Sequence, residues 1–155
     1  MTSPVLLCAD GSDHSTAALE AGLALLAPGT PLVIVTVMID PDPTLVTGTG
    51  IAGGVMSAEA FDELESDASR EAKQVAAGVQ AALSLDGAET RILRGDPGTA
   101  ICQLAAELDA AGIVIGSRGR GGFKRAVLGS VSDHVVRNAP CTVIVTGPKA
   151  TEDDA

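Results

Sequence analysis

The residues best suited to chemistry form one glycine-rich, basic stretch from Gly116 to Ser132. A short β-branched run from Ile113 to Ile115 precedes it, and valines at helical spacing follow it as far as Asn138. The stretch therefore leaves a strand and ends on the first turn of a helix. Free backbone N–H groups and the positive end of the helix dipole bind anions at such a turn. These residues predict a phosphate site.

Each residue type in this stretch has a physical task at such a site. Gly116 and Gly119 let the backbone approach a ligand closely, and Gly129 permits the turn into the helix. Hydroxyl and backbone N–H groups for phosphate oxygens come from Ser130, Val131 and Ser132. Local positive charge comes from Arg118, Arg120, Lys124 and Arg125. Taken alone, these basic residues also fit a solvated loop that merely lacks acids.

Apolar runs alternate with helical patterns along the chain, which defines the elements that must position this stretch. We expect strands at 5–9, 32–38, 88–93, 112–115 and 141–146, and the short, more polar strand at 88–93 should lie near an edge of the sheet. We expect helices at about 15–27 and 58–83, the second with Leu64 on its apolar face. A third is capped by Asp96 with Pro97 at its first position, and a fourth begins at Ser130. Nearly all the strands are uninterrupted apolar runs, typical of a parallel sheet covered on both sides. We predict an α/β fold: a single open five-stranded parallel sheet with helices on both faces, Rossmann-like, in the order 3-2-1-4-5.

Composition indicates one domain in a reducing compartment. The chain has 155 residues, 46% of them hydrophobic, which suffices for one core, so we assign residues 1–147 to a single domain and 148–155 to a disordered acidic tail. Its three cysteines form no CxxC pair, and no apolar run reaches the about 18 residues of a membrane span. A net charge of −10 argues against nucleic acid and anionic membranes as partners. We expect a cytoplasmic protein.

The end of the first strand supplies the second half of the expected site. Ligands of open parallel sheets bind beyond the carboxyl ends of the strands, where the strand order reverses. The first strand ends at Ala9 and Asp10, and the fourth at Ile115 and Gly116. If these strands are neighbours, Asp10 faces the glycine-rich stretch. There its carboxylate can accept a hydrogen bond from ribose, or hold a divalent cation that phosphates share.

Two other patterns carry less chemistry. His14 and His134 both lie on helical segments, where a surface or half-buried position is more common than a general base, so we name no catalytic residue. Residues 39–57 are rich in Pro, Gly, Thr and Asp, and we interpret them as a mobile loop. The GxGxxG spacing at 48–53 follows no strand, so a lid or a partner-facing loop fits better than a dinucleotide site.

Several separated motifs resemble the universal stress protein family. The glycines of the opening stretch and the serine after them have the spacing of that family's nucleotide-binding motif: Gly116, Gly119, Gly129 and Ser130. Residues 9–15 resemble the family's opening turn, and residues 138–145 its closing strand. The resemblance spans nearly the whole chain in the same order.

The resemblance implies a homodimeric regulator or sensor of the stress response that binds ATP, often with Mg²⁺. It implies that Asp10 is the ribose or metal-side acid, that the Val37 backbone meets adenine, and that dimers form through the last strand at 142–145. The nucleotide-binding residues that we predict are Ala9, Asp10, Val37, Ile115, Gly116, Ser117, Arg118, Gly119, Gly129, Ser130, Val131 and Ser132. Two alternatives stay open. One is a slow ATPase or phosphotransfer enzyme of a related fold, and the other is a nucleotide-independent interaction module.

Overall fold

Uninterrupted apolar strands build a parallel sheet whose two faces are both covered. The computed structural model describes residues 2–44, 56–118 and 128–147. The strands are β1 (Val5–Ala9), β2 (Leu32–Met38), β3 (Glu89–Arg94), β4 (Gly112–Gly116) and β5 (Thr142–Thr146). They are all parallel and lie in the order β3-β2-β1-β4-β5, which confirms the predicted sheet. The order places β1 at the centre, between β2 and β4.

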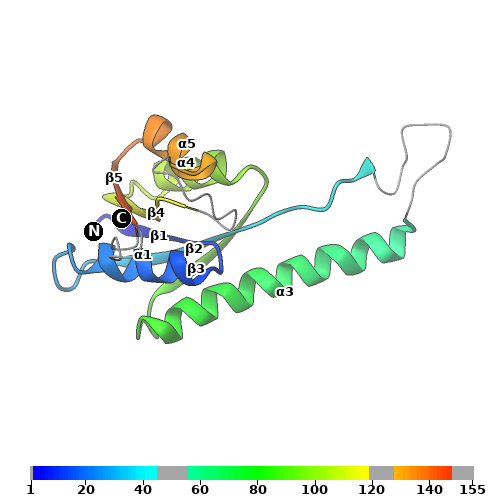
Figure 1. Cartoon of the computed structure of the whole chain (residues 1–155), viewed down its shortest axis with the longest axis horizontal. Coiled ribbons are helices and arrows are strands. Elements are labelled where there is room, and N and C mark those ends of the chain that lie inside the picture. The colour runs from blue at the N-terminus through cyan, green and yellow to red at the C-terminus, as the bar shows by residue number, and fades with distance from the viewer. Residues whose placement is uncertain (1, 45–55, 119–127, 148–155) are drawn as a thin grey trace, which may run out of the picture.

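Helices cover the sheet in two layers. The described helices are α1 (Asp13–Leu23), α3 (Ala58–Ala82), α4 (Pro97–Glu107) and α5 (Ser130–Asn138). Helices α1 and α3 pack on one face of the sheet, and α4 and α5 on the other (Figure 1). None of the described helices combines the length and the apolar character that crossing a membrane requires.

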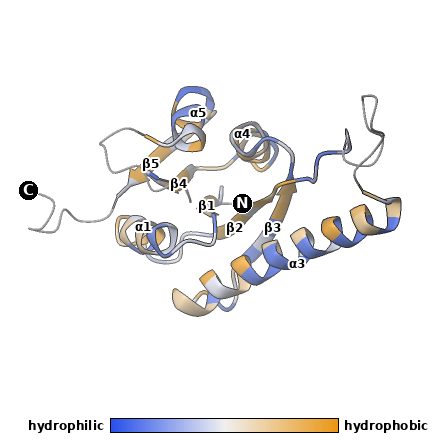
Figure 2. Ribbon diagram, turned by 45° about the vertical axis from the view of Figure 1, so that its right-hand side comes forward, coloured by the Kyte–Doolittle hydropathy of each residue, from blue (hydrophilic) through white to orange (hydrophobic). Residues whose placement is uncertain are grey.

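Side chains along β1 point alternately to the two faces of the sheet, so β1 contributes to the core on both faces. Leu6 and Cys8 belong to the apolar cluster under α4 and α5, whereas Leu7 and Ala9 belong to the cluster under α1 and α3. All of β1 is buried, as a strand covered on both faces must be. The ribbons of β2 and β5 are accordingly among the most continuously hydrophobic in the molecule (Figure 2).

Helix α1 lies slightly earlier in the chain than predicted, at Asp13–Leu23 instead of 15–27. Ser12 is its N-cap, and the Ser12 side chain accepts a hydrogen bond from the Ser15 N–H group. After Leu23 the chain forms a turn that is tighter than an α-helix, in which the N–H of Leu26 donates to the carbonyl of Leu23 at 3.1 Å. Leu26, predicted to lie on the helix, therefore lies after it. Pro28 sets the latest point at which the helix could end, since the residue before a proline, here Ala27, is biased away from helical geometry.

Helix α3 agrees with the predicted helix to within one residue, but its buried face is shorter than predicted. Its buried residues are Ala72, Ala76 and Val79, whereas Leu64, predicted to pack, is 41% exposed. The 25 residues of α3 span about 37 Å at about 1.5 Å per residue. The seven residues of β2 span only about 23 Å. The helix therefore extends past the sheet (Figure 1).

Two predictions beside this edge are confirmed. Strand β3 lies at the edge of the sheet, and most of its residues are exposed. Helix α4 begins as predicted, with Asp96 at the N-cap and Pro97 in the first turn. The Asp96 carboxylate accepts hydrogen bonds from the N–H of Thr99 at 2.9 Å and from its hydroxyl at 2.6 Å. These bonds hold the pKa of Asp96 below its ordinary value, with the Thr99 hydroxyl as the largest cause.

A glycine on α1 provides a test of how closely this helix packs on β4. A Cβ at Gly22 would lie 2.3 Å from Cγ1 of the fully buried Val114. Gly22→Ala should therefore lower the free energy of unfolding by about 1–3 kcal/mol, although alanine favours helices. Gly78→Ala on α3, where a Cβ meets nothing within 4 Å, is the matched control and should raise stability by up to about 1 kcal/mol. Urea unfolding measures both, and equal effects would contradict the packing argument.

Candidate functional site

The carboxyl ends of β1 and β4 lie side by side where the strand order reverses. Cys8 is in register with Ile115, so Ala9 and Asp10 follow beside Gly116. On the other side of β1, Ala9 is in register with Thr36, which places Val37 next along β2. The neighbouring strands that the sequence argument required are thus present. This edge is the place where an open parallel sheet binds its ligands.

Asp10 organises the loop between β1 and α1. Its Oδ1 atom accepts hydrogen bonds from the Ser12 N–H at 2.8 Å and the Ser12 hydroxyl at 2.6 Å. Gly11 between them has a φ of 87°, in the left-handed region that favours glycine. Gly11 is not among the site residues predicted from the sequence, although Asp-Gly is a turn signal that identifies it. The Asp10 carboxylate is therefore held in a defined position at the end of β1.

Ser15 connects the start of α1 to the end of β1. Its side chain is almost fully buried, at 3% exposure for the residue. The Ser15 hydroxyl accepts a hydrogen bond from the Asp10 N–H at 3.2 Å and donates one to the Cys8 carbonyl at 3.5 Å. Ser12 therefore caps α1, whereas Ser15 links the helix to the strand.

Ser117 joins three elements through its backbone. Its N–H donates to the carbonyl of Thr146 at the end of β5, at 2.7 Å. Its carbonyl accepts from the N–H of Gly129, just before α5, at 2.8 Å and from the Ser132 hydroxyl at 3.3 Å. The ends of β4 and β5 and the start of α5 are therefore locked together at this residue.

The two serines of α5 occupy different environments. Ser132 is 2% exposed, and its hydroxyl donates to the carbonyls of Ser117 and, at 3.0 Å, of Gly129. Ser130 is exposed at the first position of α5. Both were predicted to hold phosphate through their hydroxyls, but that of Ser132 already bonds two carbonyls. Ser130 keeps the hydroxyl that a ligand can reach.

The structure gives Gly116 a packing role and shows that the turn at Gly129 does not require glycine. A Cβ at Gly116 would lie 3.3 Å from Cβ of Ala18, so glycine at this position lets α1 pack against β4. Gly129 has φ −62° and ψ 160°, an extended conformation that any residue adopts, so the turn into α5 does not require glycine. The described residues do not include Gly119, Arg120, Lys124 and Arg125. Arg118 is described, and it is half-buried.

The start of α5 differs from the starts of the other described helices. Side chains of Ser12, Ser57 and Asp96 cap α1, α3 and α4. Gly129 at the start of α5 provides no side-chain hydrogen bond to the helix. A helix N-terminus that lacks such an acceptor is suited to an anion, because its first N–H groups have no partner within the helix.

The three cysteines of the chain have packing roles. Burial raises the pKa of the Cys8 thiol from 9.0 to about 12, with smaller contributions from Cys102 and Cys141. Desolvation also raises the pKa of Cys102 and Cys141, which are half-buried. A raised pKa disfavours the reactive thiolate, so the three cysteines act as small hydrophobes in the packing. Among the described residues, no three His, Cys, Asp or Glu side chains gather as a metal-binding group.

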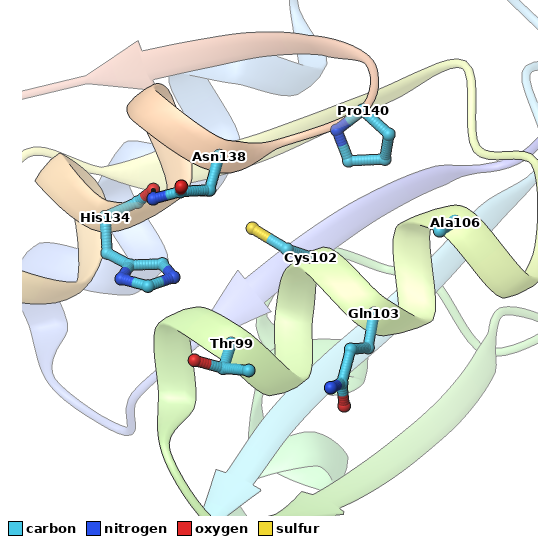
Figure 3. Close-up of a pocket in the computed structure, with 7 residues that line it drawn as sticks. All are labelled: Thr99, Cys102, Gln103, Ala106, His134, Asn138 and Pro140. Carbon is cyan, nitrogen blue, oxygen red and sulfur yellow. Dashed lines mark hydrogen bonds between the residues drawn. The ribbon is translucent and has the colours of Figure 1, made fainter.

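His134 lies away from the strand ends, in a groove between α4 and α5. The groove has a volume of about 410 Å³, and Figure 3 shows His134 on α5 and Cys102 on α4 among the residues that line it. A Cβ at Gly98 would lie 2.7 Å from the His134 ring, so glycine at the start of α4 makes room for this side chain. His134 is half-buried, as expected for a helical residue that packs.

The sequence model of the universal stress protein family matches residues 1–147. The chain belongs to the universal stress protein family. Universal stress protein YxiE of Bacillus subtilis is 30% identical to it over 148 residues, which cover 94% of this chain and 99% of YxiE. The resemblance seen in the glycine spacing therefore extends over the whole matched region.

Solved structures of this family share the fold. Universal stress protein UspA from Lactobacillus plantarum superposes with a TM-score of 0.73 at 24% identity, covering 93% of this chain and 97% of UspA. The universal stress protein of Archaeoglobus fulgidus, solved in complex with dAMP, has a TM-score of 0.52 at 26% identity. That comparison covers 93% of this chain and 97% of the A. fulgidus protein.

The buried thiol of Cys8 predicts a pH dependence of stability. Because the folded state raises this pKa, it favours the protonated thiol, and the resulting stability is present below pH 9 and lost as pH rises toward 12. Between about pH 8 and about pH 10, the wild type should lose about 1 kcal/mol more stability than Cys8→Ala. Urea unfolding at both pH values measures this difference. Parallel losses in the two proteins would show that Cys8 is not the group responsible.

Proposed function

We propose that this universal stress protein binds ATP, with Mg²⁺, at the carboxyl edge of β1 and β4. In this proposal it acts as a nucleotide-dependent regulator or sensor in the stress response. The observation that carries the proposal is the start of α5, which lacks a side-chain cap and follows a backbone anchored to the ends of β4 and β5. The A. fulgidus relative, solved with dAMP, supports an adenine nucleotide as the ligand.

In this proposal the phosphates bind at the start of α5. The hydroxyl of Ser130 and the first N–H groups of α5, including that of Val131, contact phosphate oxygens because the helix dipole is positive there. Arg118, half-buried just after β4, adds positive charge nearby. Ser117 and Ser132 position these groups through their bonds to one another. Residues 1–147 form the nucleotide-binding domain, and the tail at 148–155 lies outside the described residues.

Asp10 and Val37 serve the other end of the ligand. Asp10 ends β1 beside β4, so its carboxylate can accept from ribose hydroxyls or contact a Mg²⁺ ion held mainly by the phosphates. Phosphates must supply most of the ligands, since the described side chains form no three-residue metal group. The backbone of Val37, near the end of β2, contacts the adenine. The rest of the proposed nucleotide site is lined by Ala9, Ile115 and Gly116.

A regulator fits this edge better than an efficient enzyme does. Hydrolysis requires a group that takes a proton from water close to the phosphates. His134 packs against Gly98 in the groove between α4 and α5, and His14 is exposed on α1. Asp10 is the acid nearest to the end of β4 along the paired strands, and it is engaged with Ser12. Slow ATP hydrolysis with Asp10 on the metal remains the alternative.

The outer strand β5 supports dimerisation as part of this proposal. It lies at the edge of the sheet, and its three central residues are apolar and half-buried: Val143, Ile144 and Val145. An apolar edge strand tends to pair with another chain unless it is blocked. We propose that two copies pair through Thr142–Val145.

Nucleotide binding can be tested with two serine variants. Calorimetry with ATP and MgCl2 should show binding that Ser130→Ala weakens about tenfold or more, since one charge-assisted hydrogen bond contributes about 1.5–3 kcal/mol. Ser66→Ala on α3, away from the strand ends of β1 and β4, is the matched control and should bind like the wild type. Mass spectrometry of the freshly purified, denatured protein should detect copurified adenine nucleotide.

Unchanged binding by Ser130→Ala, or equal weakening by Ser66→Ala, would contradict the assigned phosphate site. Turnover of ATP above about one per minute that Asp10→Asn abolishes would favour the slow enzyme instead. Typical enzymes are much faster than this threshold. No binding of ATP by the wild type would overturn the proposed function.

Dimerisation through β5 predicts a specific sensitivity to charge. Sedimentation of the wild type should give the mass of a dimer, and Val145→Lys should give a monomer because lysine on an edge strand opposes pairing. Val136→Lys, at a valine of α5 that is 46% exposed, is the matched control and should stay dimeric. Circular dichroism checks that both variants are folded. A dimer that survives Val145→Lys would place the interface elsewhere.

A further inference from the structure

The first turns of α3 lack the buried apolar contacts that hold the rest of the helix on the sheet. The buried residues of α3 all lie in its second half: Ala72, Ala76 and Val79. Within residues 58–71 none is buried, Phe61 is half-buried and Leu64 is exposed. These turns also project past the sheet (Figure 1). Apolar burial therefore contributes less to their position than to that of the second half of the helix.

Arg94, at the end of β3, joins these turns to the sheet. Its guanidinium donates from Nε to Oδ1 of Asp40 at 2.9 Å, and Nη2 lies 2.8 Å from the same oxygen. Nη2 also pairs with Glu65 of α3. Arg94 is in register with Met38, the last residue of β2, and Asp40 follows two residues later. One guanidinium thus links the end of β3, the segment after β2 and the start of α3.

The other ion pairs between described residues each stay within one element. They are Arg70 with Asp67 on α3, Arg91 with Glu89 on β3, and Arg137 with Asp133 on α5. Among these described residues, only the partners of Arg94 are distant in sequence, at separations of 54 residues for Asp40 and 29 for Glu65. The Arg94 network therefore holds segments in place, whereas the other pairs support single elements.

This network is open to solvent and therefore sensitive to salt. The side chains are 56% exposed for Arg94, 40% for Asp40 and 35% for Glu65. Dissolved ions screen such charges, because the Debye length falls from about 10 Å at 0.1 M salt to about 3 Å at 1 M. Local openings of a native protein also begin where few apolar side chains are buried, as in the first turns of α3.

We propose that Arg94, Asp40 and Glu65 form an ionic lock that holds residues 58–69 of α3 against the ends of β2 and β3, and that ionic strength controls its release. In the closed state both acids bond to Arg94. In the open state all three side chains are hydrated, and residues 58–69 leave the strands and unwind. The helix from Ala72 onward stays packed on the sheet in both states. High salt favours the open state because it screens the attraction that only the closed state has.

Hydrogen exchange with mass spectrometry tests the lock on the full chain without nucleotide. At about 0.1 M KCl, Arg94→Gln should speed exchange of the amides at 62–69 about twofold to tenfold, the range expected for an exposed charge network. The amides at 76–82 should exchange as in the wild type. Arg91→Gln is the matched control, because it removes the same charge from the same strand but breaks a pair within β3. Raising KCl to about 1 M should speed exchange at 62–69 in the wild type and change it little in Arg94→Gln.

A double-variant comparison separates the lock from the general charge of α3. Arg94→Gln combined with Glu65→Gln should speed exchange no more than Arg94→Gln alone, because both changes remove the same interaction. Glu63→Gln, at an exposed acid on the same part of α3, should exchange like the wild type. Additive effects, equal acceleration by Arg91→Gln or Glu63→Gln, or exchange at 62–69 that salt leaves unchanged would overturn the lock. So would one exchange rate along the whole of α3. Circular dichroism and urea unfolding confirm that each variant is folded.

Discussion

The parallel pairing of β1 with β4 is the contact on which the site depends. These strands are neighbours in the sheet but not in sequence. From β1 the sheet continues to β2 and β3 on one side and to β4 and β5 on the other. Leu6 and Leu7 of β1 and Ile113 and Val114 of β4 are fully buried, and the hydrophobic effect holds the two strands in register. As a result Asp10 and Gly116 meet at one edge, although more than 100 residues separate them along the chain.

Internal hydrogen bonds then organise that edge in advance of any ligand. Asp10 binds its own loop through Ser12, and Ser117 receives bonds from both Gly129 and Ser132. The hydroxyl of Thr146 donates to a carbonyl of α1 at 2.6 Å, so β5 is tied to the same region. A loop that is already held in place loses little conformational entropy when it binds. This preorganisation supports the proposed binding of a nucleotide at this edge.

The β3 edge of the sheet is held together by different interactions. Strand β3 is exposed and polar, and α3 is longer than the strands that it covers. Salt bridges from Arg94 to Asp40 and to Glu65 of α3, rather than apolar packing, hold the first turns of α3 beside the strand ends. Exposed ion pairs contribute little stability individually, so this region has a smaller energetic link to the core than α1 does. The proposed nucleotide site and the first turns of α3 are therefore stabilised by different kinds of contact.

The sequence alone determined the order and type of the elements, because strands buried on both faces are continuous apolar runs and amphipathic helices have a clear period. It also determined the family, since the spacing of Gly116, Gly129 and Ser130 belongs to one local motif. Only the tertiary structure decided which serine hydroxyl bonds to the backbone and that Gly116 makes room for Ala18. It also decided that α3 extends past the sheet. These features depend on contacts between distant segments, and a local pattern contains no information on which atoms those contacts bring together.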